Sequence, residues 1–311
     1  MLTAHDSMDK GMNRRKLTLF LLITGCLITA FAASCGFFHH KIYAQLYFPE
    51  KSAQLLVPIT VSVTRLTPSI LISDLEKGDP NPKNLLPLFP DKGTFPQVST
   101  GGKTIFINFK TPPPAEEAPL LIPGILATFQ QLPKYKAVLF SVNGNPETLG
   151  EGGVELGRFS LRKFWINDNL DLTPFPYMTG EYQKGIVYLE LKRSHYLVPV
   201  TLRFPGNITI EKAVAAAISE SPDSMSWLLK TPLPSGFKIL SVSRSHDGIV
   251  NIVIHPSGSS RGNTLANRAL ALSFCGISGV KDVRIRVGTG IFSWRPLQSK
   301  PNFVNIVSKN K

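Results

Sequence analysis

Hydrophobic and polar positions alternate along several short stretches in the second half of the chain. Residues 185–191 (GIVYLEL) and 196–204 (YLVPVTLRF) are rich in β-branched and aromatic side chains, so the pattern predicts two strands. Pro199 cannot donate a ladder hydrogen bond, which indicates that the second strand lies at an edge or contains a bulge. Residues 233–245 and 247–255 are predicted to form two further strands, joined by the tight Asp-Gly turn that is typical of a hairpin.

Two stretches between these strands have the signals of helices. The first begins at the cap residue Asn207 or Thr209 and ends near Pro222. The second spans residues 261–277, has apolar side chains at helical spacing and ends at glycines. With a last predicted strand at residues 280–288, the core order is α-β-β-α-β after two initial strands. We therefore expect an α/β (α+β) domain in which a sheet carries helices on one face.

The first half of the chain repeats this pattern. Residues 55–63 (LLVPITVSV) match residues 196–204, which places Val57 and Val198 141 positions apart. Two later pairs of stretches match in the same order at an offset of 145. Three ordered matches predict a domain-sized unit that is used twice. Three residue pairs are expected to lie in equivalent buried positions: Val57 and Val198, Phe129 and Phe274, Val142 and Val287.

The repeat and the length of the chain suggest a division into domains. At 311 residues there is room for about two ordinary domains, and 43% hydrophobic residues are enough to form real cores. In the first copy the late helix contains Pro119 and Pro123, which are expected in its first turn or at a kink. The expected parts are a signal segment 1–34, a first domain 41–144, a linker 145–184, a second domain 185–290 and a basic C-terminal tail 291–311. Residues 161–168 suggest that the linker is partly structured and docked.

The N-terminus has the form of an export signal peptide. A basic stretch ends at Lys16, an apolar stretch spans residues 17–32, and small residues precede Cys35. Three outcomes are open: lipidation of Cys35 with cleavage before it, ordinary cleavage after the Ala-Phe-Ala of residues 30–32, or retention of the segment as an anchor. Cys26 is a poorer candidate for lipidation because an apolar stretch follows it. We expect lipidation at Cys35, which places the protein on the extracytoplasmic side of the cell membrane.

The charge and the cysteine content limit the partners that we expect. The formal net charge of +13 favours anionic partners such as a phospholipid surface or a wall polymer. Nucleic acid also fits the charge, but it does not fit the predicted compartment. Beyond the signal segment only Cys275 remains, within a predicted apolar helix, so no disulfide framework is expected. The tail 291–311 is either a solvated chain end or a contact with an anionic surface.

An ordered set of features in the second copy resembles the GerM domain of sporulation and spore-germination lipoproteins. The features are a proline-glycine turn, a strand, a short hairpin turn and a Gly-Val-Lys strand start, at Pro234, Gly236, Lys238–Val242, Asp247–Gly248 and Gly279–Val283. The resemblance covers Ile42–Gly144 and Gly185–Gly290. The tandem arrangement is similar to the ring-building motifs of sporulation channels. This resemblance implies a lipoprotein with a role in assembly across the space between two membranes.

A search of the sequence for catalytic, metal and cofactor sites finds no such constellation. We interpret His39 and His40 as a solvated pair beside the anchor, not as metal ligands. Residues 143–153 are glycine-rich but lack the Gly-Lys-Ser/Thr of a phosphate loop. Side-chain oxygens alternate as in a calcium loop, but without its glycine and glutamate, at Asn167, Asn169 and Asp171. We therefore expect no catalytic residue, no metal and no cofactor, and one modified residue, Cys35.

Two hypotheses of function follow from the sequence. The first is a membrane-anchored, non-catalytic assembly or scaffold protein of sporulation and spore germination, as the resemblance implies. Its expected partners are other sporulation membrane or channel proteins, with self-association possible in addition. The second is an extracytoplasmic lipoprotein that binds a cell-wall polymer, such as peptidoglycan, or a small ligand.

Overall fold

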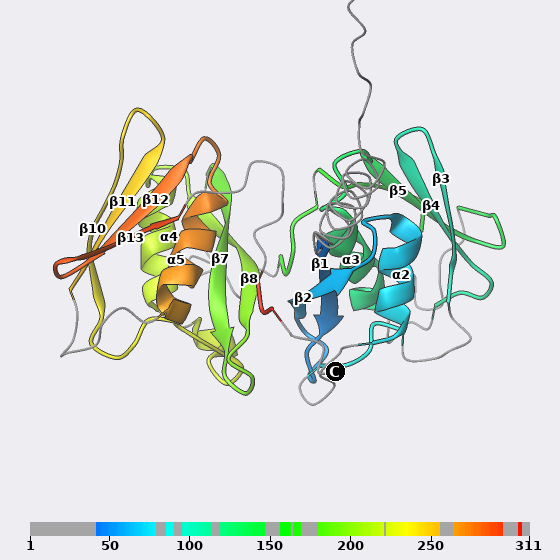
Figure 1. Ribbon diagram of the computed structural model, residues 1–311, viewed down its shortest axis with the longest axis horizontal. Helices are drawn as coiled ribbons and strands as arrows, with labels where there is room; N and C mark the ends of the chain where they lie inside the picture. The colour runs from blue at the N-terminus through cyan, green and yellow to red at the C-terminus, as the bar shows by residue number, and fades with distance from the viewer. Residues whose placement is uncertain are drawn as a thin grey trace, which may run out of the picture. The chain divides into compact units, whose positions relative to one another are not determined.

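Two modules of matching architecture make up most of the described chain (Figure 1). We call them module 1 (residues 42–162) and module 2 (residues 180–294). Two short segments follow the modules, arm 1 (residues 164–168) and arm 2 (residues 304–306). The computed structural model describes residues 42–78, 85–89, 95–113, 118–146, 156–162, 164–168, 180–220, 222–255, 264–294 and 304–306.

Module 1 contains a two-stranded sheet, a four-stranded sheet and two helices. Its elements in chain order are β1 (Ile42–Pro49), β2 (Leu56–Val63), α2 (Pro68–Glu76), β3 (Gln97–Gly101), β4 (Thr104–Phe109), α3 (Ala118–Phe129), β5 (Ala137–Val142) and β6 (Arg158–Ser160). Strands β1 and β2 form an antiparallel hairpin. The larger sheet has the order β3-β4-β5-β6, in which only the central β4–β5 pair is parallel.

Module 2 repeats this arrangement. Its elements are β7 (Tyr182–Leu191), β8 (Leu197–Pro205), α4 (Ile210–Ser219), a 3-10 turn (Asp223–Met225), β9 (Leu229–Lys230), β10 (Lys238–Arg244), β11 (Ile249–His255), α5 (Thr264–Cys275), β12 (Asp282–Val287) and β13 (Gly290–Trp294). The larger sheet has the order β10-β11-β12-β13, with the same strand directions as in module 1. The smaller sheet has the order β8-β7-β9, so β8 is an edge strand, as its proline predicted.

The strand registers confirm the repeat at the level of single residues. In the smaller sheets Phe48 pairs with Val57, and Leu189 pairs with Val198, which is a shift of 141 positions for both partners. In the larger sheets the parallel pairs begin at Thr104 and at Ile249, which is a shift of 145. The shift changes from 141 to 145 between the small sheet and the central strands of the large sheet.

Each module has three layers. The helices lie between the small sheet and the large sheet, because α2 contacts both β1 and β3, while α4 contacts both β7 and β10 (Figure 1). The sequence predicted one sheet with helices on one face, and this was wrong in detail. The first two strands of each copy form a separate sheet on the far side of the helices, which buries both faces of the helical layer.

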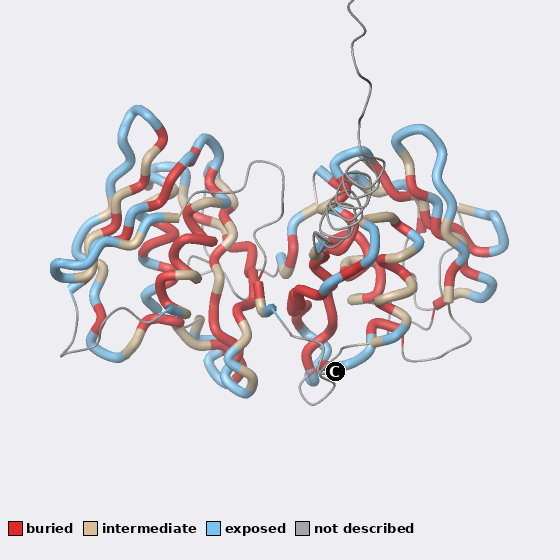
Figure 2. Tube along the Cα trace, in the orientation of Figure 1, coloured by how far each residue is buried: buried red, intermediate tan, exposed pale blue. Residues whose placement is uncertain are grey.

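The cores occupy the spaces on either side of the helices (Figure 2). In the larger sheet, the side chains of β4 point alternately to the core and to solvent. Ile105, Ile107 and Phe109 are fully buried, whereas Phe106 is exposed. The predicted equivalent positions are occupied as expected for five of the six residues. Val57, Val198, Phe129, Phe274 and Val142 are buried, whereas Val287 is only partly covered at the end of β12.

Helix ends and prolines follow the local rules. Pro68 begins α2 behind the cap residue Thr67, whose hydroxyl accepts a hydrogen bond from the Ile70 N–H at 3.4 Å. Pro119 lies in the first turn of α3, and Pro123 lies inside this helix. Next to it, Gly124 permits a close approach, because a Cβ there would lie 2.7 Å from a Leu88 methyl carbon.

The structure adds two strands to the ranges that the sequence assigned to a linker and a tail. Strand β6 lies within residues 145–184 and pairs with β5, and β13 extends beyond residue 290 and pairs with β12. The prediction that 280–288 is the last strand is therefore wrong. A two-residue turn with Gly288 at φ 57° returns the chain to the sheet as β13. Within the described residues, no helix is both long enough and apolar enough to cross a membrane.

Candidate functional site

The two edge strands β2 and β8 cross where the modules meet. The side-chain amide of Asn167 donates to the carbonyl of Leu56 (2.9 Å) and to the carbonyl of Pro199 (2.7 Å). The amide of Asn305 donates to the carbonyls of Pro58 (2.8 Å) and Leu197 (2.9 Å). One nitrogen therefore bridges both strands at each of two neighbouring points.

The bridges are reciprocal between the modules. Asn167 follows module 1, and its Oδ1 also accepts from the Leu56 N–H at 2.8 Å. Asn305 follows module 2, and its Oδ1 accepts from the Leu197 N–H at 2.9 Å. Leu56 and Leu197 are equivalent residues of the repeat, as are Pro58 and Pro199. Exchanging the two modules thus maps each bridge onto the other, which gives this contact an approximate two-fold symmetry.

The backbones of the arms form hydrogen bonds with the open edges of the crossing strands β2 and β8. In arm 1 the Ile166 carbonyl accepts from the N–H (3.2 Å) and the hydroxyl (2.6 Å) of Thr201 in β8. In arm 2 the Thr60 hydroxyl donates to the Val304 carbonyl (2.5 Å) and accepts from the Val304 N–H (3.1 Å). Thr60 and Thr201 are both fully buried. Each arm therefore pairs with the strand of the other module.

The repeated prolines explain why side chains make these bridges. Pro58 and Pro199 have no N–H, so the two edge strands cannot form a continuous ladder with each other. An asparagine amide offers one donor group and one acceptor on a short side chain, as a peptide unit does. Both asparagines have positive φ angles, 49° at Asn167 and 52° at Asn305, a conformation that asparagine tolerates better than most residues.

Tyr47 is buried and Tyr188 is partly buried, at equivalent positions of the small sheets. Burial raises the pKa of Tyr47 above its ordinary range, and the neighbouring Tyr188 phenol raises it further. Burial raises the pKa of Tyr188 to about 12, with a smaller contribution from Cys275. The backbone N–H of each tyrosine is bonded to a helix hydroxyl, Tyr47 to Thr128 (3.2 Å) and Tyr188 to Ser273 (2.9 Å).

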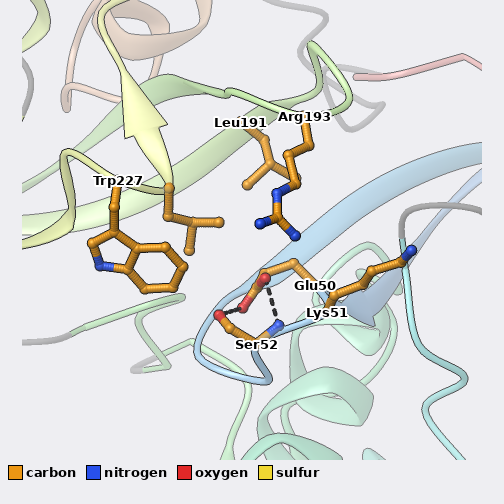
Figure 3. Close-up of a pocket in the computed structure, with 7 residues that line it drawn as sticks. Glu50, Lys51, Ser52, Leu191, Arg193 and Trp227 are labelled. Carbon is orange, nitrogen blue, oxygen red and sulfur yellow. Dashed lines mark hydrogen bonds between the residues drawn. The ribbon is translucent and has the colours of Figure 1, made fainter.

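A cleft lies between the hairpin turns that precede β2 and β8 (Figure 3). It has a volume of about 220 Å³, and its lining residues are Glu50, Lys51, Ser52, Leu191, Arg193, Trp227 and Leu228. The turn of module 1 is held by Glu50, whose carboxylate accepts from the N–H groups of Ser52 (2.8 Å) and Gln54 (3.0 Å). The guanidinium of Arg193 points toward this turn, and the indole of Trp227 stands on the other side of the cleft (Figure 3).

Comparison with known proteins identifies the first module. Residues 45–148 match the Germane family, described as sporulation and spore germination. Among solved structures, the tandem GerMN domains of the sporulation protein GerM from Bacillus subtilis align with 86% of this chain and 100% of that chain. Their sequence identity is 18% and the TM-score is 0.58, so the chain has the fold of tandem GerMN domains.

The first GerMN domain of the same Bacillus subtilis protein covers 41% of this chain and 96% of its own length, at 14% identity and a TM-score of 0.25. The comparison with curated proteins gives no match. The Germane match and the tandem fold agree with the resemblance noted in the sequence, including its two copies.

Several candidate residues from the sequence lie outside the described part of the chain. These are Cys26, Cys35, His39, His40, Asn169 and Asp171. Asn167, which was considered as a calcium ligand, instead bridges the two modules. Cys275 is partly buried, and burial raises the pKa of its thiol to about 12, with a smaller contribution from Asp282. No group of three or more metal-ligand side chains gathers within the described residues.

The arms contact the crossing strands, and of the two the sequence predicted only that residues 161–168, which contain arm 1, are partly structured and docked. They fall in ranges that were interpreted as a linker and a tail, and each is only a few residues long. A signal was present, because Phe-Trp-Ile-Asn ends at Asn167 and Asn-Phe-Val-Asn ends at Asn305. The buried residues Ile166 and Val304 occupy the same place before each asparagine. The match is too short to be found without the positions of its partners.

Proposed function

We propose that this protein is a membrane-anchored assembly protein of sporulation and spore germination, which works by association and not by catalysis. The observation that carries the proposal is the reciprocal bridging by Asn167 and Asn305. It joins two Germane-type modules through paired backbone groups, so the chain presents both modules as one unit. The family that matches residues 45–148 is described as sporulation and spore germination, which supports a role in these processes.

The large sheets supply surfaces for association. In β12 the side chains of Val283 and Ile285 are fully buried, while Arg284 and Arg286 are exposed on the other face. In module 1 the corresponding face of β4 exposes Phe106 to 36%. One face of each large sheet thus remains open to solvent within the described residues, and the two open faces differ in chemistry. We infer that each module binds a different surface of its partners.

The predicted anchor and partners complete the proposal. Lipidation at Cys35 would hold both modules at the outer face of the cytoplasmic membrane. Tethering raises the effective concentration of the modules toward other membrane-bound proteins. The partners that we propose are other sporulation membrane or channel proteins, together with further copies of this chain.

Complementation of a strain that lacks the gene tests this function. The charge reversals Arg284→Glu and Arg286→Glu, introduced together, are expected to lower the yield of heat-resistant spores while the amount of protein stays normal. The control is Arg65→Glu, since Arg65 is exposed in a loop of module 1. Normal spore yield in the double variant would contradict the assigned surface. The non-catalytic role would be contradicted if the protein converted a substrate and one polar substitution abolished this activity.

A further inference from the structure

We propose that the cleft between the two hairpin turns binds a sugar ring that carries an anionic group, as found in cell-wall glycans. This inference goes beyond the assembly role, because a scaffold of two modules does not require it. It rests on three observations: the exposure of Trp227, the direction of Arg193 and the size of the cleft.

Trp227 is the first observation. Its side chain is 54% exposed although tryptophan is a large apolar residue, and it borders the cleft beside the buried Leu228. The repeat does not demand an aromatic residue here. Leu85 of module 1 corresponds to Leu229 of module 2, because the two residues pair with equivalent positions, Glu50 and Leu191. Trp227 lies two residues before Leu229, and the corresponding residue before Leu85 is Lys83. A flat, exposed indole offers a surface on which the C–H face of a pyranose ring can pack.

Arg193 is the second observation. Its guanidinium is directed into the cleft (Figure 3), and it forms no ion pair with any described residue. A guanidinium presents a planar set of donors that matches a carboxylate or a phosphate. The carboxylate of Glu50 does not occupy these donors, since Glu50 is only 2% exposed and accepts from the N–H groups of its own turn.

The size of the cleft is the third observation. Its volume of about 220 Å³ is below the ~300–1,000 Å³ of pockets that enclose drug-sized ligands. It suits one ring of a longer polymer, with the rest of the polymer outside. Leu191 and Leu228 supply an apolar part of the wall, while Ser52 and Lys51 supply polar groups at the rim. The ligand class that fits is therefore a polar ring with one apolar face and one negative group.

Calorimetric titration of the full chain in detergent, with three defined probes, tests the inference. The probes are the disaccharide N-acetylglucosaminyl-N-acetylmuramic acid, which carries a carboxylate, N-acetylglucosamine 1-phosphate, and neutral chitobiose. We expect at least one anionic probe to bind about tenfold more tightly than chitobiose, the ratio that one charge-assisted contact supplies. Preference for the carboxylate indicates a peptidoglycan-type glycan, and preference for the phosphate indicates a phosphate-linked wall polymer.

Variants then assign the binding to the cleft. Trp227→Ala and Arg193→Gln are each expected to weaken binding of the anionic probe by about tenfold or more. The matched controls are Tyr182→Ala and Arg65→Gln, since both residues are exposed and neither lines the cleft. Thermal unfolding of each variant confirms that the fold is intact. Three results would overturn the inference: no binding of either anionic probe, equal binding of chitobiose, or unchanged affinity in both cleft variants.

Discussion

At the scale of single residues, two asparagine side chains hold the contact between the modules. Asn167 and Asn305 each satisfy one backbone N–H and two backbone carbonyls across the contact between the modules. No larger apolar residue could replace them, because the groups that they satisfy would remain buried and unpaired. Their small size and positive φ angles fit the narrow space between the crossing strands.

Removal of either asparagine amide is expected to destabilise the protein. Asn167→Ala and Asn305→Ala should each lower the free energy of unfolding by about 1–3 kcal/mol, the cost of leaving buried polar groups unsatisfied. Urea unfolding measures the change. The control is Asn143→Ala, because Asn143 also has a positive φ angle (49°) but is exposed. If all three variants lose the same stability, backbone strain explains the effect and the bridges do not.

The partly buried phenol of Tyr188 makes stability depend on alkaline pH. Its pKa is raised to about 12 by burial, whereas an unfolded tyrosine titrates near ~10. The protonated form is therefore favoured by folding, and this stability is present below about pH 10 and lost as the pH rises through the folded value. Tyr188→Phe should remove roughly 2 kcal/mol of the loss between about pH 10 and pH 12. Unfolding curves across this range, with exposed Tyr182→Phe as control, measure it; identical pH slopes in all three proteins would refute the assignment.

At the scale of elements, the sequence predicted the strands and helices that have a periodic pattern, but not the contacts of the short arms. The α-β-β-α-β order and the 233–255 hairpin follow from alternation, helix caps and an Asp-Gly turn, and the structure confirms them. The division of each copy into two sheets was not visible, because alternation does not say which strands pair. Residues 161–168 were expected to dock, but neither their docking site nor arm 2 could be predicted, because both depend on the open edges of β2 and β8, which are distant in the sequence.

Another repeated contact joins a helix to a strand in each module. The Ser273 hydroxyl of α5 donates to the Ala269 carbonyl within its helix (2.8 Å) and accepts from the Tyr188 N–H of β7 (2.9 Å). Thr128 of α3 accepts from the Tyr47 N–H in the same way. These hydroxyls satisfy strand groups that no neighbouring strand reaches.

Loss of the Ser273 hydroxyl tests this contact. Ser273→Ala should lower the free energy of unfolding by about 1–3 kcal/mol, because the Tyr188 N–H then stays buried without its acceptor. Ser219→Ala is a matched control, since Ser219 also donates to a helix carbonyl, that of Ala215 at 2.8 Å. The control should change stability by less than about 0.5 kcal/mol. Guanidinium unfolding gives both values, and an equal loss in the two variants would show that the strand contact is unimportant.

At the scale of the whole molecule, the anchor and the two modules act together in the proposed function. The anchor is expected at Cys35 and lies outside the described residues. One acyl chain gives only marginal membrane binding, whereas two are enough for stable attachment. A bacterial lipoprotein carries at least two.

Mass spectrometry of the membrane fraction tests the anchor. The wild-type chain is expected to begin at a diacylated Cys35, and Cys35→Ala should abolish this species and change the electrophoretic mobility. Cys26→Ala is the control, and it should leave processing unchanged. An unmodified Cys35 in a membrane-bound chain would instead identify the N-terminal segment as an uncleaved anchor.

The central claim is that reciprocal arms join the two modules into one unit. Differential scanning calorimetry of the full chain, in detergent, tests it most directly. We expect a single transition for the wild type, with equal calorimetric and van't Hoff enthalpies, because neither module can lose its arm contacts alone. The Asn167→Ala, Asn305→Ala double variant should unfold in two separate steps. Two separate transitions in the wild-type chain would contradict the account.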